Sequence, residues 1–319
     1  MLYSVNEPAT EQDLISCFRL MLARVPADAE RMAWLQRIVA EGLTPPDVGD
    51  IVRNSDEYRR RLNRIKRPVQ LELEGSTVFV SPDDAEIGKH VLRVREYEPH
   101  VARAIKSVLR EGQVFVDVGA NAGYHTLLAA RIVGEAGKVI AIEANPCNTR
   151  LLRAAVRANR MEGRVISFDL AATSEQCLLE LLAGASNGEV QVLTPGDSES
   201  ELVQGLALDT ILAPFGRVDV IKTDTEGHEL SVLQGAMDTL RNFRPVILFE
   251  FHPYLLERKG VPPESILNLL TELQYKIAII PREGPVGDPL GHEQIMEEWR
   301  KINAEQEMEG KLHMDLIAT

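Results

Sequence analysis

Residues 114–130 read VFVDVGANAGYHTLLAA. The stretch begins with a short apolar segment typical of a buried strand and continues, from Thr126, into a helical segment. Gly119 and Gly123 lie between the two, and because glycine lacks a Cβ the backbone turns tightly there and approaches a ligand closely. In open α/β sheets, ligands bind beyond the carboxyl ends of the strands. We therefore expect a ligand site around residues 117–123.

Six further segments have the same short, apolar and β-rich character. Helical segments such as 148–159 separate them, and this alternation indicates a parallel sheet that is covered on both faces. The sequence therefore predicts an α/β fold with seven strands and helices between them. The six further strands are expected at 138–144, 164–171, 218–224, 245–251, 275–280 and 312–318.

The N-terminal part of the chain has a helical pattern instead. Apolar residues recur at helical spacing over 10–62, and prolines and glycines punctuate them. We expect three or four short helices there, with Asp28 and Thr44 as helix caps. The basic stretch 59–67 is interpreted as a linker or a helix end.

The length of 319 residues leaves room for one sizeable α/β domain and a smaller one. We predict a small all-α domain at 1–66 and a larger domain at 67–319. Alternating apolar residues over 69–80 predict a β-hairpin ahead of the sheet, and 98–110 predicts a helix. The segment 184–205, rich in Gly, Ser and acids, is interpreted as a loop able to form a lid.

Composition and charge argue against several classes of protein. The net charge of -13 opposes binding to phosphate-rich polymers, so no nucleic-acid partner is expected. Cys17, Cys147 and Cys177 are odd in number and widely scattered, which argues against disulfides and zinc and favours the reducing cytosol. The first residues lack an apolar signal region, and no run of about 18 apolar residues occurs. We therefore expect a cytoplasmic protein without a membrane span.

Polar residues at the strand ends form a coherent nucleoside-binding set. Glu143 ends the second strand, 24 residues after Gly119, where it is placed to accept hydrogen bonds from both ribose hydroxyls. Asn145 is expected to line the ribose as well. Asp169 ends the third strand, and we weigh a hydrogen bond with the adenine amino group against an ordinary surface acid.

The glycine spacing decides between nucleosides. A dinucleotide site has the pattern G-x-G-x-x-G, and Asn121 occupies the middle glycine position, which disfavours NAD. The helix N-terminus offers N–H groups to a carboxylate, and Asp117 is suited to accept a hydrogen bond from an ammonium. The amino-acid end of S-adenosylmethionine needs both features, so it is the predicted cofactor. Its expected binding residues are Asp117, Gly119, Asn121, Gly123, Glu143, Asn145 and Asp169.

Acids and imidazoles follow the fourth and fifth strands. Asp224 lies at the switch between the two halves of the sheet and is expected to face the methyl group of the cofactor. An alcohol that accepts a methyl group must lose its proton, for which a buried carboxylate or imidazole would serve as general base. The candidate catalytic residues are Asp224, Glu226 and His252, and the choice of base among them stays open.

Neighbouring residues have weaker claims. His125 and His228 are secondary candidates, and Glu229 is interpreted as part of a capped helix start. No metal ion is predicted, although Glu250 together with Asp224 and Glu226 leaves open a divalent cation that acidifies the hydroxyl.

The motifs VFVDVGANAGYHTLLAA, KVIAIEANP, VDVIKTDTEGHELSVLQGA and RPVILFE together resemble the FkbM family of methyltransferases over about residues 78–319. The resemblance implies the Rossmann-like class I methyltransferase fold, with strand order 3-2-1-4-5-7-6 and strand seven antiparallel. It also implies S-adenosylmethionine as donor and hydroxyls of sugars, lipids or natural products as acceptors. The family typically has a small or apolar residue where His228 stands, which counts against a catalytic His228.

Residues 10–62 resemble a small helical module seen in bacterial surface and glycan-related proteins. This resemblance favours a glycan acceptor and a role of the module in docking or homo-oligomerisation. The alternative is a helical cap over the apolar surface of the larger domain.

The leading hypothesis is an S-adenosylmethionine-dependent O-methyltransferase that acts on a hydroxyl of a sugar, glycan or related polyhydroxyl metabolite. One alternative is an NAD-dependent oxidoreductase, against which stand Asn121 and the lack of an obvious Tyr-x-x-x-Lys pair. A second alternative is a catalytically silent, cofactor-binding scaffold protein.

Overall fold

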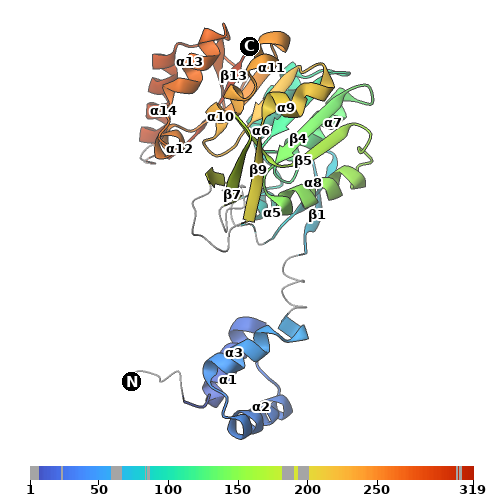
Figure 1. The fold of residues 1–319 in the computed structure, drawn as a ribbon, viewed down its shortest axis with the longest axis vertical. Helices are drawn as coiled ribbons and strands as arrows, with labels where there is room; N and C mark the ends of the chain where they lie inside the picture. Colours follow the sequence, from blue (N-terminus) through green and yellow to red (C-terminus); the bar gives the residue numbers. More distant parts are fainter. Residues whose placement is uncertain are drawn as a thin grey trace. The chain divides into compact units, whose positions relative to one another are not determined.

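The chain forms two compact units, Met1–Arg67 and Pro68–Thr319. Each unit has its own apolar core, and Figure 1 traces both along the chain. The computed structural model describes residues 7–22, 24–58, 67–82, 84, 87–181, 190–192, 201–306, 308 and 311–319.

Short helices build the N-terminal unit. Thr44 precedes a helix as expected, and its backbone N–H and hydroxyl donate to Asp47. The expectation for Asp28 was wrong, because Ala27 is the N-cap and Asp28 is already the first helical residue. Residues 59–66, interpreted above as a linker or helix end, lie outside the described residues. The elements are α1 (Glu11–Cys17), the π-helical turn η1 (Phe18–Leu22), α2 (Asp28–Glu41) and α3 (Pro45–Arg53), packed around Leu14, Phe18, Ile38, Val48 and Val52.

A seven-stranded sheet forms the centre of the larger unit. Its spatial order is β12, β13, β11, β10, β3, β4, β5, which confirms the expected order 3-2-1-4-5-7-6. All pairings are parallel except those of β13, which runs antiparallel to β11 and β12. The strands are β3 (Val114–Val118), β4 (Lys138–Glu143), β5 (Val165–Asp169), β10 (Val220–Thr223), β11 (Val246–Phe251), β12 (Ile277–Ile280) and β13 (Met314–Ala318).

Helices cover both faces of this sheet, as the near-continuous apolar strands predict. Alternate strand residues enter two separate clusters; Phe115 and Val139 lie in one, for example, and Val116 and Ile140 in the other. The first cluster is completed by α5 (Gly88–Val94), α6 (Pro99–Val108), α7 (Tyr124–Val133) and α8 (Pro146–Ala158). The second is completed by α9 (Leu208–Leu212), η2 (Ala213–Phe215), α10 (Glu229–Gln234), α11 (Met237–Phe243), α12 (Pro253–Arg258), α13 (Glu264–Glu272) and α14 (His292–Glu305).

Two smaller sheets accompany the large one. The expected hairpin is present as β1 (Val69–Leu73) and β2 (Ser76–Val80), with Leu71 opposite Val78. A four-stranded sheet follows β5 in the chain and was not expected from the sequence. Its order is β6 (Ala171–Thr173), β9 (Glu201–Ala207), β7 (Cys177–Leu181) and β8 (Val190–Val192).

The region interpreted as a lid loop is therefore partly strand. Residues 190–192 and 201–205 belong to β8 and β9, while 182–189 and 193–200 lie outside the described residues.

None of the helices in the described part of the chain is both long and apolar enough to span a membrane.

Candidate active site

The turn after β3 brings its backbone against the end of β10. These strands are parallel neighbours, with Val118 opposite Thr223, so Gly119 lies beside Asp224. Gly119 has a φ of +76°, and a Cβ built on it would lie 1.8 Å from the backbone carbonyl oxygen of Asp224. No other residue fits this position without moving one strand end.

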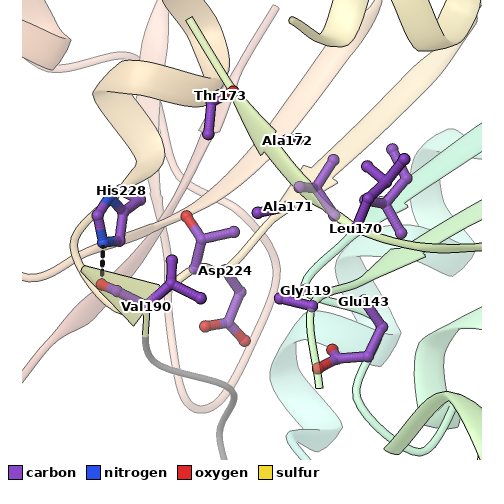
Figure 2. Close-up of a pocket in the computed structure, with 13 residues that line it drawn as sticks. Gly119, Glu143, Leu170, Ala171, Ala172, Thr173, Val190, Asp224 and His228 are labelled. Carbon is purple, nitrogen blue, oxygen red and sulfur yellow. Dashed lines mark hydrogen bonds between the residues drawn. The ribbon is translucent and has the colours of Figure 1, made fainter. Parts of the chain in front are cut away.

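A first pocket opens beside this contact, at the carboxyl ends of β3, β4 and β10. It encloses about 430 Å³, including space open to solvent. Figure 2 shows Gly119 between the carboxylates of Glu143 and Asp224. Its other walls are chiefly apolar, and the lining residues are Val118, Gly119, Ile142, Glu143, Ala144, Leu170, Ala171, Ala172, Thr173, Val190, Asp224, Thr225 and His228.

Glu143 is the buried acid of this pocket, with 3% of its surface exposed. Its two carboxylate oxygens accept hydrogen bonds from the backbone N–H groups of Asn121 (2.7 Å) and Asn145 (2.8 Å), which fix the side chain. Burial raises the pKa of Glu143 to about 7, although these hydrogen bonds oppose the shift. The carboxylate is thus held at the pocket wall, ready to accept from hydroxyl groups.

Two residues expected near the nucleoside are engaged elsewhere. The Asp169 carboxylate accepts a hydrogen bond from Arg153 (2.7 Å) and does not line the first pocket; its neighbour Leu170 does. The Asn145 side chain accepts from the backbone N–H of Cys147 and caps α8. Asp169 ends β5 as predicted, but its side chain pairs with α8, so the structure does not bring it to the ligand space.

The remaining predicted residues of the turn after β3 have different structural roles. Gly123 has a φ of +93° and packs closely on Leu152, while Asn121 lines a second pocket described below. Asp117 is fully buried and lines neither pocket. Its Oδ2 accepts from the hydroxyl of Thr126 (2.5 Å), so it anchors the turn from beneath.

Lys222 is a buried cation that the sequence analysis did not single out. Its Nζ lies 3.1 Å from Oδ2 of Asp224, 3.8 Å from Oδ1 of Asp117 and 3.4 Å from the carbonyl oxygen of Gly119. Burial alone would lower the pKa of Lys222, but the surrounding carboxylates raise it above its usual value. The lysine therefore stays charged and holds the ends of β3 and β10 together electrostatically.

A second pocket lies on the other side of Gly119 and Asp224, which line both pockets. It encloses about 750 Å³, including space open to solvent. Acids and imidazoles dominate its walls. The lining residues are Ile87, Tyr97, Glu98, Gly119, Asn121, Asp224, Glu226, Glu250, His252 and His313.

The three candidate catalytic residues meet in this second pocket. Asp224 pairs with Lys222, and Glu226 is half-buried with a φ of +54°. His252 is 8% exposed, and its Nδ1 has no hydrogen-bond partner among the described residues. Burial, reinforced by His313, lowers the pKa of His252 to about 4, so the imidazole is neutral at pH 7.

The secondary candidates have structural partners. His228 lines the first pocket, but its Nε2 lies 2.8 Å from the carbonyl oxygen of Val190 and joins α10 to β8 (Figure 2). His125 Nε2 lies 2.9 Å from Oε2 of Glu98 and lines neither of these pockets. Glu229 accepts hydrogen bonds from the backbone N–H groups of Thr225 and Gly227, as expected of a capped helix start.

Glu250 was considered above together with Asp224 and Glu226 for a divalent cation. Across the described ranges, no group of three or more His, Cys, Asp or Glu side chains is arranged to hold a metal ion. Glu250 instead contacts His313, with Oε1 3.1 Å from Nδ1.

Several residues that line or adjoin the two pockets were not predicted from the sequence, for different reasons. Lys222 gave a usable signal, because a charged residue inside an apolar strand needs a buried partner. Glu98 and His313 gave none, since they lie outside the strands and reach the pocket only through tertiary packing. The segment 170–173 was hidden because β6 was not expected as a separate strand.

The sheet order and the paired pockets at its carboxyl edge define a class I methyltransferase fold. The chain belongs to the FkbM family: the family model for the methyltransferase FkbM domain matches residues 117–277. The protein is thus a methyltransferase by family, which sets aside the oxidoreductase alternative.

Two relatives of this chain come from archaea. The hexuronic acid methyltransferase AglP of Haloferax volcanii is 29% identical over 239 residues, covering 73% of this chain and 92% of its own. A protein-L-isoaspartate O-methyltransferase of Archaeoglobus fulgidus is 40% identical over only 62 residues, 19% of this chain and 28% of its own.

Solved structures similar to this chain include a methyltransferase FkbM from Methylobacillus flagellatus. Its TM-score is 0.40 at 15% identity, covering 92% of this chain and 72% of that one. Another is TYW2 of M. jannaschii, solved in complex with AdoMet, with a TM-score of 0.41 at 14% identity, covering 79% and 85%.

Proposed function

We propose that the protein is an S-adenosylmethionine-dependent O-methyltransferase that modifies a hydroxyl of a sugar, glycan or related polyhydroxyl compound. The observation that carries the proposal is that two pockets share Gly119 and Asp224. A methyl transfer needs donor and acceptor to meet at one point, and positioning supplies much of the rate. We assign Gly119 and Asp224 as the place where donor and acceptor meet.

The first pocket suits the nucleoside half of the donor. Glu143 offers a fixed, buried acceptor for the two ribose hydroxyls, while Ile142 and Leu170 offer apolar surface for a flat base. Gly119 and Asp224 line both pockets, so a ligand that reaches from one pocket to the other would lie beside them. Asn121 and Glu98, on the second-pocket side, are the nearest candidates for the amino-acid end.

His252 is the residue we assign as general base. When bound, S-adenosylmethionine would supply a methyl carbon on a cationic sulfur, open to attack by the acceptor oxygen. The acceptor hydroxyl must give up its proton, and the unpartnered Nδ1 of a neutral, buried imidazole is suited to take it. Asp224, with one oxygen engaged by Lys222, is assigned to orienting the reacting groups.

Two further observations support the proposal. The relative AglP is named for a sugar-derived acceptor, which favours a sugar hydroxyl here. Cys17, Cys147 and Cys177 are free thiols, as is usual in the reducing cytosol.

We infer that residues 67–319 form the methyltransferase domain and that residues 1–66 form a separate helical domain for docking or homo-oligomerisation.

Calorimetry with S-adenosylhomocysteine and with NAD tests the proposal. We expect the first ligand to bind and NAD to give no heat. Methyl transfer is then followed with radiolabelled donor and a pool of sugars. Absence of S-adenosylhomocysteine binding would overturn the proposal, and binding without transfer to any acceptor would favour the scaffold alternative.

A further inference from the structure

Two buried polar atoms in the second pocket lack a partner. Oε2 of Glu250 and Nδ1 of His252 have no hydrogen bond within the described part of the chain, and their residues are 7% and 8% exposed. Glu250 lines the pocket from β11, and His252 lines it two positions further on, at the N-cap of α12. Buried polar groups without partners are costly, so a ligand with neighbouring hydroxyls would relieve two deficits at once.

The neighbouring imidazole fixes how Glu250 is presented. A guanidinium N–H of Arg282 donates to Nε2 of His313 (3.1 Å), so Nε2 is the acceptor of this ring and Nδ1 carries its N–H. Nδ1 lies 3.1 Å from Oε1 of Glu250, so this oxygen is occupied and Oε2 is the one left for a ligand. The acid is held in place before any acceptor binds.

The charge of the pocket is one-sided. The carboxylates of Glu98, Asp224 and Glu226 line it, and no lysine or arginine is among the lining residues that the structure describes. Burial and the neighbouring acids raise the pKa of Glu250 well above its usual value, which favours the neutral form of this carboxyl. Lys222 stands behind Asp224, 3.1 Å away, and is 4% exposed. A second cation, Arg282, is engaged by His100 and His313. Among the described residues that line this pocket, an acceptor therefore meets carboxylates and no lysine or arginine that would pair with a negative charge.

We propose that this second pocket is the acceptor site and that it takes sugars without a negative charge, uncharged or amino-bearing, in preference to sugars that carry a carboxylate. Neighbouring hydroxyls bind Oε2 of Glu250 and Nδ1 of His252. The inference rests on the proposed function, which it deepens by naming the acceptor class. A like charge placed several ångströms from the pocket carboxylates weakens binding by roughly tenfold.

The test compares sugars that differ in charge and in the one substituent that carries it. Methyl glucoside, methyl glucosaminide and methyl glucuronide share one ring and one stereochemistry, and the galacto and manno series repeat the comparison. Binding to the full-length protein saturated with S-adenosylhomocysteine is measured by ligand-observed NMR titration. In at least one series we expect the uncharged and amino members to bind about tenfold more tightly than the uronide.

The outcomes separate this inference from the proposed function. Equal or tighter binding of the uronides would overturn the inference, as would the absence of binding in all three series. Neither result touches the proposed function, which fails only if S-adenosylhomocysteine does not bind or no acceptor is methylated.

A pair of variants tests the cause. Glu226→Gln removes one carboxylate from the pocket lining and should reduce the discrimination against the uronide by roughly threefold. The control Glu264→Gln changes an exposed acid in the first turn of α13, outside both pockets, and should leave the discrimination unchanged. Equal discrimination in both variants would show that the pocket charge does not select the acceptor.

Discussion

Nζ of Lys222 lies 3.1 Å from Oδ2 of Asp224, inside the sheet and with only 4% of the lysine exposed. Oδ1 of Asp117 lies 3.8 Å from the same nitrogen. One cation thus serves two carboxylates at the ends of adjacent strands, which is where the two pockets meet. We therefore expect Lys222 to contribute to the stability of the folded protein as well as to the electrostatic potential at this edge of the sheet.

Replacing Lys222 with methionine should be strongly destabilising. The change leaves the carboxylates of Asp117 and Asp224 without their cation, and breaking a buried pair in this way costs about 3 to 5 kcal/mol. Urea unfolding at pH 7 measures the loss. The control Lys301→Met removes an exposed cation on α14 and should stay within about 0.5 kcal/mol of the wild type.

The pH dependence of this contribution follows from the direction of the shift. The pKa of Lys222 is raised above its usual value of 10.5, so its contribution is complete below pH 10.5 and is lost as pH rises further. The difference between wild type and Lys222→Met should therefore be constant from neutral pH to about pH 10 and shrink above it. A difference under about 1 kcal/mol at pH 7 would contradict the assigned role.

The close approach of Gly119 to Asp224 predicts that alanine is not tolerated there. Gly119 and Gly112 have nearly the same φ, +76° and +78°, but a Cβ on Gly112 meets no atom within 4 Å. Gly112→Ala should therefore cost only the left-handed backbone conformation, about 1 to 2 kcal/mol. Gly119→Ala carries the same cost plus the clash, and should lose binding of S-adenosylhomocysteine as well. Equal effects of the two variants in unfolding and calorimetry would contradict the close-contact argument.

How far the sequence predicts this molecule depends on how local each feature is. The seven strands and their order were predicted, because each strand is an apolar run between helices and the motifs resemble a family with a known order. The small sheet was missed, since β6 and β8 have three residues each and are stabilised mainly by partners distant in sequence.

The site residues divide in the same way, into those predictable from local sequence and those placed by tertiary packing. Gly119 and Glu143 were expected to line a pocket, and they do, because strand-end positions follow from the pattern alone. Asp169 was expected at the nucleoside, yet its side chain pairs with Arg153 on α8, a contact set by helix packing. His313 lies in the segment before the last strand and reaches the pocket only because β13 inserts between β11 and β12.

Binding of the donor should depend on the ionisation of Glu143. Its pKa is raised to about 7, and the ionised carboxylate is the better acceptor for two ribose hydroxyls. The affinity for S-adenosylhomocysteine, measured by calorimetry, should therefore increase as pH rises from 6 to 8. Glu143→Gln should bind about tenfold or more weakly, with a flat profile. Asp169→Asn, changed at the position opposite Glu143 in the sheet, should stay within about twofold of the wild type.

The raised pKa of Glu143 also affects the stability of the unliganded protein. The folded-state pKa of Glu143 lies above its usual value of 4.5, so the contribution of this residue to stability is complete below pH 4.5 and is lost as pH rises through about 7. Glu143→Gln should gain thermal stability relative to the wild type between pH 5 and pH 8. A wild-type advantage that grows over this range would contradict the raised pKa.

His252→Gln should separate catalysis from donor binding. If the imidazole takes the acceptor proton, the variant should lose about a hundredfold or more in kcat while its affinity for S-adenosylhomocysteine is unchanged. Because the pKa of His252 is lowered to about 4, the wild-type kcat/KM for the acceptor, measured at saturating S-adenosylmethionine, should stay level from pH 8 to about pH 5 and fall as the imidazole becomes protonated. His292→Gln, in the first turn of α14 and outside both pockets, is the matched control and should keep the wild-type kcat. Full activity of His252→Gln together with an inactive Asp224→Asn would instead assign the proton transfer to Asp224.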